Sequence, residues 1–394
     1  MTSSANPEPL LLRPTEDDGG RSARMLARRA QRGELVRLAP GTYASTHRWL
    51  LLSRQDRRRV TAVAFADSRR RPVTFCGTTA LELLGYPVVE RASLLHVRAA
   101  HRGDSGTRRQ VSPYVNEQAV LRTVAELSAQ GLINGDGRVP LLPSVRRHWN
   151  APGAAWAGTA DCGQEAGLGP MTVGDEAPAE VLGPVGGPLS LTVTEVSVRL
   201  EDGTVLGRVR VDPLPAAMAM VFGSEPLSTG TAPADAIKRR HGDAETVAGQ
   251  ARGLLRTAAQ RIRFDAQWRF ADSRSESAGE SLSRALIHEA GFVVPDLQYR
   301  VLTATGELVA RTDFYWDEIR LTAEFDGLAK YTGRLARLGA AGPVGQDALV
   351  REKRREDAVR REGYGMARWI WADLFTRPRF VALLEQYGVP RRGR

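Results

Sequence analysis

The chain has 394 residues, 42% of them hydrophobic and 25% charged, which is ordinary for a folded globular protein of two or three domains. No apolar run reaches the ~18–20 residues of a membrane span, and the first twenty residues lack the layout of a signal peptide. Cys76 and Cys162 have no CxxC partner, and the six histidines show no ligand spacing, which argues against a disulfide scaffold and a Cys or His metal site. We therefore expect a cytoplasmic protein without a membrane partner.

The net charge of +10 is concentrated near the N-terminus. Residues 21–71 hold 14 arginines and three acids, whereas residues 151–198 hold six acids and no Lys or Arg. A cationic module of this kind favours the phosphate backbone of a nucleic acid as its partner. The alternative is a basic surface that is only solvated.

Composition separates four stretches, 1–20, 21–100, 101–195 and 196–394, and residues 151–185 show no period of 2 or 3.6, which is typical of a flexible linker or a surface insertion. The expected organisation is a disordered tail over 1–20, a winged-helix-like region over 21–100, a Gly/Ala/Pro-rich insertion or linker over 101–195, a helical connector over 196–275 and a nuclease-like domain over 276–394.

The basic module begins with an Ala- and Arg-rich segment, Arg21–Arg32, which predicts a helix stopped by Gly33. Two short extended runs then flank Ala39-Pro40-Gly41 and predict a β-hairpin. A helix followed by a basic hairpin is typical of the second half of a winged helix-turn-helix.

The phrases RRAQRGELVRLAPGTYAS and FCGTTALELLGYPVV resemble the N-terminal region of AbiEi-type antitoxins of bacterial abortive-infection systems. The resemblance implies DNA as a partner, with the helix in a major groove and the hairpin beside it, and a cognate toxin as a second partner. On this basis Arg24, Arg28 and Arg37 are expected to bind DNA.

The segment RTDFYWDEIRLTAEFDGLAKY predicts two strands, Arg311–Trp316 and Ile319–Asp326, joined by a two-residue turn. If residue 316 pairs with 319, one face is apolar and the other carries four polar residues. Asp313 and Glu324 then become diagonal neighbours, about 7–8 Å apart at the backbone. The polar face would comprise Asp313, Thr322, Glu324 and Asp326.

Adjacent acids on a well-patterned sheet repel each other unless a cation lies between them. A Mg²⁺ or Mn²⁺ ion relieves that repulsion, activates a water molecule and stabilises charge on a phosphate. A carboxylate pair is also the acid/base machinery of glycosidases, for which this basic chain offers no aromatic-rich sugar cleft. The remaining alternative is a solvated face whose acids pair with arginines.

The flanking segments add a helix beginning near Ser277, a basic amphipathic helix over Arg351–Glu362 and a strand over Met366–Trp371. The predicted order is helix, strand, strand, helix, strand. Arg354 and Arg361 lie two helical turns apart and are candidates for phosphate contact. Trp369 and Trp371 alternate on the last strand and are expected in the core.

This order, with Glu280, the RTDF and EFDG segments and the pattern EKxRED…GY…RWxW, resembles the PD-(D/E)XK nuclease superfamily in its branch similar to Vsr endonucleases. The resemblance implies that Asp313 and Glu324 ligate Mg²⁺ or Mn²⁺ and that Glu280 contacts the metal through water. Asp326 stands where the superfamily usually has a lysine, and Lys330 is the candidate for supplying that charge.

The expected fold class is therefore α+β, with an N-terminal winged-helix-like region, a flexible middle insertion and a C-terminal restriction-endonuclease-like α/β core. The expected function is metal-dependent hydrolysis of DNA phosphodiester bonds in bacterial defence or repair. The alternative is a non-catalytic DNA-binding regulator or antitoxin, in which the nuclease fold is only a scaffold.

Overall fold

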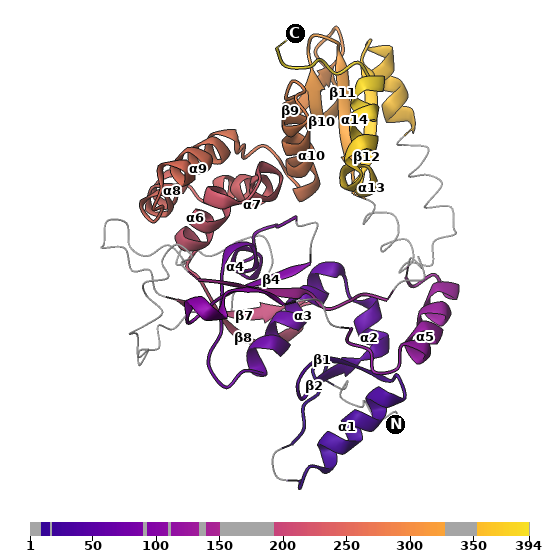
Figure 1. Cartoon of the computed structure of the whole chain (residues 1–394). Helices are drawn as coiled ribbons and strands as arrows, with labels where there is room; N and C mark the ends of the chain where they lie inside the picture. Colours follow the sequence, from indigo (N-terminus) through magenta and orange to yellow (C-terminus); the bar gives the residue numbers. More distant parts are fainter. Residues whose placement is uncertain are drawn as a thin grey trace. The chain divides into compact units, whose positions relative to one another are not determined.

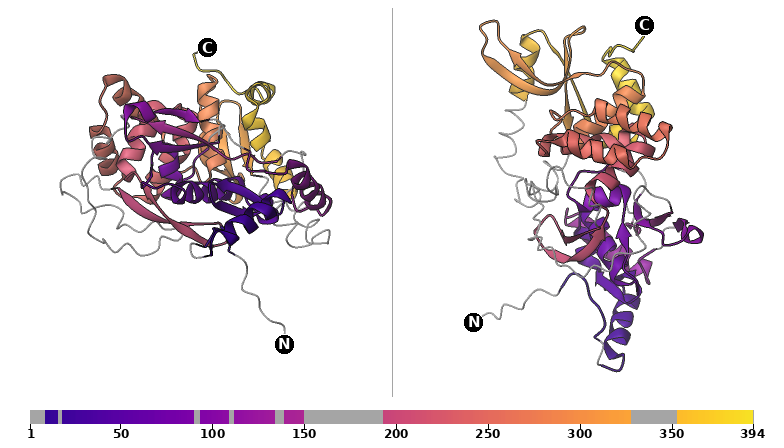
Figure 2. Two further views of the ribbon diagram at one scale, coloured as in Figure 1. Left: turned by 60° about the horizontal axis from the view of Figure 1, so that its bottom comes forward. Right: turned by 90° about the vertical axis from the view of Figure 1, so that its left-hand side faces the viewer.

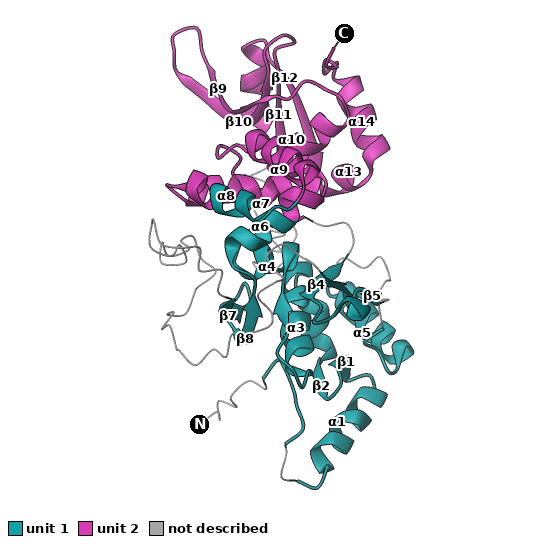
Figure 3. Cartoon of the chain, turned by 60° about the vertical axis from the view of Figure 1, so that its left-hand side comes forward, with its two compact units in different colours: residues 1–85, 92–220, 249–256 teal, residues 86–91, 221–248, 257–394 magenta. Residues whose placement is uncertain are grey.

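The computed structural model describes residues 9–15, 18–89, 93–108, 112–133, 139–149, 193–327 and 353–393. In these ranges the chain is α+β, and it divides into two compact units (Figures 1 and 3). No helix within them is long and apolar enough to cross a membrane. Unit 1 comprises residues 1–85, 92–220 and 249–256, and unit 2 comprises residues 86–91, 221–248 and 257–394.

Unit 1 contains the β1–β2 hairpin and a mixed six-stranded sheet in the order β5-β6-β4-β3-β8-β7, in which β4 runs parallel to β6 and β3 parallel to β8. Its elements, with α6 continuing into unit 2, are α1 (Arg21–Gln31), β1 (Leu35–Ala39), β2 (Thr42–Ser45), α2 (Thr46–Leu51), α3 (Arg54–Asp67), β3 (Thr74–Phe75), α4 (Gly77–Leu83), β4 (Leu94–Arg98), a 3₁₀ turn (Arg102–Asp104), β5 (Gly106–Arg108), α5 (Glu117–Ala129), β6 (Ser144–His148), β7 (Thr194–Arg199), β8 (Val205–Val211) and α6 (Leu214–Ser224).

The predicted N-terminal helix and hairpin are present. Helix α1 ends before Gly33, whose φ of +80° belongs to the left-handed region that favours glycine. The N-terminal segment is not wholly a disordered tail, because Leu10 is buried and Leu12 pairs with Tyr43. These apolar side chains cover surfaces that the hairpin alone would leave in water.

The predicted insertion over 101–195 also needs correction in its described part. Helix α5 and strands β5 and β6 lie in this range and β7 begins at its end, and the three strands belong to the six-stranded sheet. Val120 and Val124 of α5 join the apolar core beside Trp49, which explains why this part folds. The proposed linker over 151–185 lies outside the described residues.

Unit 2 combines helices with a four-stranded sheet in the order β12-β11-β10-β9, in which only the β11–β12 pair is parallel. Strands β9 and β10 form a long curved hairpin, orange in the right-hand view of Figure 2. The elements are α7 (Leu227–Arg240), α8 (Ala244–Gly253, shared with unit 1), α9 (Ala258–Phe270), α10 (Ala278–Glu289), β9 (Asp296–Leu302), β10 (Leu308–Trp316), β11 (Leu321–Asp326), a helix over 353–361, β12 (Gly365–Ile370), α13 (Trp371–Phe375) and α14 (Arg377–Gln386).

Helices cover the sheet of unit 2. Leu282 of α10 and Phe380 of α14 share a buried cluster with Phe314 and Trp369 of the strands. A second cluster joins Val359, on the helix over 353–361, to Val301 and Ala310 of β9 and β10. The sheet is thus held between helices, and burial of its apolar side chains supplies the main stabilisation.

Several elements of this region differ from those expected from the sequence. The predicted helical connector over 196–275 also contains strands β7 and β8, which precede helices α6 to α9. Strand β9 was not predicted. Trp371 begins α13 instead of ending a strand, and its ring packs edge-on against Phe325, whereas Trp369 is in the core as predicted.

Candidate functional site

The β10–β11 hairpin places the two predicted metal ligands closer than expected. Trp316 pairs with Leu321, so four residues separate the strands instead of two. The register therefore shifts by two residues, which preserves the faces. The last observed pair is Phe314 with Ala323, and continuing this register by one residue sets Asp313 opposite Glu324 instead of diagonal to it. Opposed residues on one face have Cβ atoms about 4.5–5.5 Å apart, so the carboxylates are neighbours.

Asp313 lies in a half-buried, negatively charged environment. Its Oδ2 accepts a hydrogen bond of 2.9 Å from the Phe325 amide on β11. Burial, and after it the charge of Glu280, raises the pKa of Asp313 from 3.8 to about 7, although the Phe325 hydrogen bond acts in the opposite direction. Glu324 adds to the increase. The structure thus brings Glu280, Asp313 and Glu324 within electrostatic reach of one another.

Glu280 is fixed by its position in the first turn of α10. The Ser277 hydroxyl accepts a hydrogen bond from the Glu280 amide, and Glu280 Oε2 accepts one of 2.8 Å from the Glu276 amide. Glu280 is 6% exposed. Helix α10 approaches the sheet closely here, since a Cβ built on Gly279 would lie 1.9 Å from the Phe325 ring.

Glu324 is held by two arginines that the sequence did not single out. Nη2 of Arg355, on the helix over 353–361, donates to both carboxylate oxygens at 2.6 and 2.7 Å. Arg368 lies beside Glu324 in the β11–β12 register, with its Nη2 3.3 Å from Glu324 Oε2. Arg355 follows directly after Arg354, the predicted phosphate-contacting residue. Arg354 lies on the exposed face of the helix, whereas Arg355 lies on the face that meets Glu324.

Gln298 is a further site residue that the sequence did not reveal. Its Nε2 donates to Glu280 Oε2 at 3.0 Å, and its φ of +56° is unusual for a residue with a side chain. Its neighbours Leu297 and Tyr299 would share one face of a regular strand. Here Leu297 packs in the cluster beneath α10, whereas Tyr299 packs against the cluster that contains Val359. The strained backbone therefore changes the facing of β9 at the point where Gln298 reaches Glu280.

The other predicted catalytic positions are less closely involved. Asp326 ends β11, half-buried, on the same face as Glu324 by strand alternation. Lys330 lies outside the described residues. In the described part of the chain, no set of three or more His, Cys, Asp or Glu side chains converges closely enough to hold a metal ion.

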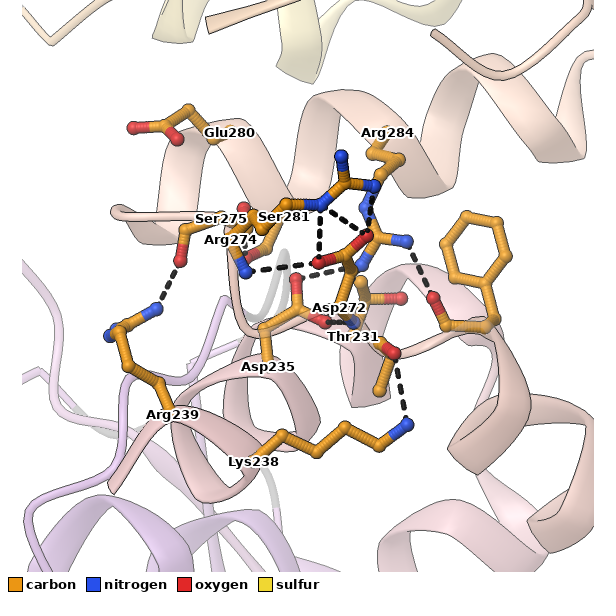
Figure 4. A network of polar contacts seen from close by, with 12 residues as sticks. Thr231, Asp235, Lys238, Arg239, Asp272, Arg274, Ser275, Glu280, Ser281 and Arg284 are labelled. Atoms are coloured by element: carbon orange, nitrogen blue, oxygen red, sulfur yellow. Dashed lines mark hydrogen bonds and ion pairs between the residues drawn. The ribbon is translucent and has the colours of Figure 1, made fainter. Parts of the chain in front are cut away.

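The helices behind the site hold α10 through a polar network (Figure 4). Asp235 of α7 accepts hydrogen bonds of 2.7 and 2.8 Å from Arg284 of α10, and both side chains are buried. Lys238 and Arg239 of α7 donate to carbonyls of the segment between α9 and α10. The network fixes helix α10, and Glu280 points away from it (Figure 4). The Glu280 carboxylate therefore contacts Gln298 of the sheet instead.

The predicted nucleic-acid-binding arginines are solvent-exposed. Arg24 and Arg28 lie on α1 and, with two other arginines and Met25, line a surface hollow. Arg37 is the exposed residue in the middle of β1. In unit 2, Arg354 and Arg361 are exposed on the helix over 353–361.

Comparisons with known proteins give little functional information. No family model matches the chain, and no solved structure matches it. Two curated relatives from Mycobacterium tuberculosis, "Uncharacterized protein MT2308" of strain CDC 1551 / Oshkosh and "Uncharacterized protein Rv2248" of strain H37Rv, are each 41% identical over 64 residues. The matched segment is 16% of this chain and spans 23% of the relatives' length.

Proposed function

We propose that the chain is a metal-dependent DNA endonuclease that hydrolyses phosphodiester bonds within a defence or repair system. The observation that carries the proposal is that Asp313 and Glu324 follow the last pair of the β10–β11 ladder on one sheet face, where the charges of Glu280 and Glu324 both raise the pKa of Asp313. A fold gains no stability from gathering buried like charges, so such a cluster is a candidate for function.

Two of the carboxylates, Asp313 and Glu324, are of the chemical type that a small, hard divalent cation binds, and water would have to complete its shell. Carboxylate oxygens are the ligands that Mg²⁺ and Mn²⁺ prefer, and a positive charge would offset the repulsion around Asp313. Asp313 and Glu324 would hold the ion, and Glu280 would orient water beside it. Bound there, the ion would supply Lewis-acid stabilisation of the phosphate and a more acidic water.

Other residues of the protein would position Glu280 and bind the DNA backbone. Gln298 and the Glu276 amide hold Glu280 in place. Arg354 and Arg361 present exposed charges suited to the DNA backbone. The AbiEi-like basic surface of α1 would add affinity in unit 1 through Arg24 and Arg28.

Cleavage of supercoiled plasmid tests this function. With Mg²⁺ or Mn²⁺, wild type should nick or linearise the plasmid, and EDTA, Asp313→Asn or Glu324→Gln should each abolish the reaction. Arg360→Met should retain cleavage, because Arg360 pairs with Glu356 and not with the carboxylate cluster. Absence of cleavage by wild type on both plasmid and mismatched duplexes would refute the proposal.

The exposed arginines of α1 favour a second candidate, a non-catalytic DNA-binding regulator or antitoxin with a cognate toxin. A regulator would bind DNA without metal, and Asp313→Asn would leave that binding unchanged. Arg28→Ala would weaken it and reduce its salt dependence. Gel shifts in EDTA, beside the cleavage assay, separate the two functions.

A further inference from the structure

Two arginines from different elements meet on a single carboxylate of the candidate site. Arg355 approaches Glu324 from the helix over 353–361, and Arg368 from the neighbouring strand β12. The Glu324 side chain is 14% exposed, whereas those of Arg355 and Arg368 are 35% and 30% exposed. The pair therefore lies at the boundary between the acidic cluster and solvent.

This contact gives Glu324 two competing classes of partner. A guanidinium is a monovalent donor with a planar fork that suits carboxylate and phosphate equally. A divalent cation binds the same oxygens with twice the charge. The Arg355 Nη2 contacts engage both Glu324 oxygens, so a cation that approaches either oxygen is repelled by the charge of Arg355.

We propose that Arg355 and Arg368 hold Glu324 in the metal-free protein and transfer to a DNA phosphodiester when a divalent cation takes Glu324. The inference rests on the proposed function and adds to it a phosphate-binding pair and a contact that restrains the free site. Metal and DNA then assist each other, since the cation releases the donors that the phosphate requires.

The position of the arginines favours this exchange. Arg368 Nη1 lies 3.9 Å from Glu356 Oε2. Glu356 also forms an ion pair with Arg360, whose Nη2 is 2.6 Å from Glu356 Oε1. Arg355 and Arg368 thus lie beside the exposed basic surface of the helix over 353–361, where the DNA backbone is expected. A short side-chain movement toward that surface leaves the sheet and its core unchanged.

The test measures Mn²⁺ and DNA binding separately, without reference to catalysis. Isothermal titration with Mn²⁺ should show Arg355→Met binding about tenfold more tightly than wild type, the order of one charge-assisted contact. Arg368→Met should act in the same direction. Arg360→Met is the matched control, because it removes the same charge from the same helix without touching Glu324.

DNA binding should change in the opposite sense. With Ca²⁺ present, Arg355→Met should bind a short duplex at least about tenfold more weakly than wild type, the order of one lost charge-assisted contact. Inorganic phosphate, used as a competitor, should not displace the duplex from wild type at equal concentration. Displacement would mean that the arginines form a free-phosphate site, which would overturn the assignment to DNA.

Unchanged or weaker Mn²⁺ binding by both Arg355→Met and Arg368→Met would also overturn the inference, whatever the plasmid assay gives. Tighter Mn²⁺ binding together with weaker DNA binding would support it. Plasmid cleavage, run in parallel, reports on the proposed function alone. A protein that shows the exchange but never cleaves would therefore retain the inference and lose the nuclease.

Discussion

Replacing Asp235 with asparagine should destabilise unit 2 strongly, because it leaves a buried arginine without its counter-ion. The Asp235 side chain is 0% exposed and that of Arg284 is 4% exposed. Burial raises the pKa of Asp235 in spite of the attraction of Arg284, so the pair is retained against a considerable desolvation cost. Removing one partner of such a pair costs about 3–5 kcal/mol.

The lower end of that range applies here. Arg284 keeps a hydrogen bond to the Phe270 carbonyl and a stacking contact 4.4 Å from the Phe270 ring. In the wild type the backbone N–H of Asp272 donates a hydrogen bond to Asp235 Oδ1. The side-chain amide oxygen introduced by Asp235→Asn could still accept this bond. We therefore expect a loss of about 3 kcal/mol in the free energy of unfolding. That corresponds to a fall in Tm of about 6–12 °C for a domain of this size.

Urea unfolding followed by tryptophan fluorescence measures this loss. The Asp235→Leu/Arg284→Met double variant should recover most of the stability, because it removes both charges together. Arg274→Met is the control, since Arg274 is 54% exposed in its pair with Asp272 and its removal should cost less than about 1 kcal/mol. A loss for Asp235→Asn no larger than that of Arg274→Met would refute the reasoning.

Three further predictions concern packing, the site and pH. Gly279→Ala should cost about 1–3 kcal/mol in urea unfolding, because its Cβ would overlap an aromatic ring of β11. Gln298→Leu should reduce cleavage about tenfold or more with unchanged DNA affinity in a filter-binding assay, since Glu280 loses a charge-assisted hydrogen bond. Burial lowers the pKa of His96 from 6.5 to about 3, so the unfolded state binds the extra proton and stability falls as pH drops from about 6.5 toward 3. In wild type this proton uptake lowers the free energy of unfolding by up to about 1.4 kcal/mol per pH unit. Urea unfolding of His96→Gln at several pH values should show a pH dependence without this contribution. The comparison with the variant is necessary because burial raises the pKa of Asp212 to about 6, which acts in the opposite direction.

Matched variants control these three experiments. Gly249→Ala, on α8 with no neighbour near its Cβ, should not destabilise the protein. Gln386→Leu, exposed at the end of α14, should cleave like wild type. His47→Gln, also exposed, should leave the pH dependence unchanged. If a control behaves like its test variant, the corresponding local explanation is wrong.

The sequence predicted the faces of the carboxylate hairpin better than its turn. Alternation of apolar residues from Phe314 to Phe325 determines which side chains point into the core, and this alternation tolerates a two-residue error in register. The turn length depended on Arg320, whose φ of +46° is not readable from its residue type. Asp313 and Glu324 were thus placed on the correct face and at the wrong separation.

Side chains that reach the site through tertiary structure could not be predicted in the same way. Gln298 lies on β9, whose facing changes at a strained backbone position. Arg368 becomes a partner of Glu324 only because β12 pairs in parallel with β11. On the helix over 353–361, a rotation of about 100° between neighbours decides that Arg355, and not Arg354, meets the carboxylate.

Single-turnover cleavage of an end-labelled duplex by wild type and Asp313→Asn tests the central claim most directly, with the dissociation constant of the same duplex measured in EDTA. The account predicts cleavage by wild type with Mg²⁺ or Mn²⁺ and a loss of at least about 10²–10³-fold in the variant, at equal DNA affinity. Equal cleavage by both proteins, or DNA binding by wild type without any cleavage, would contradict it.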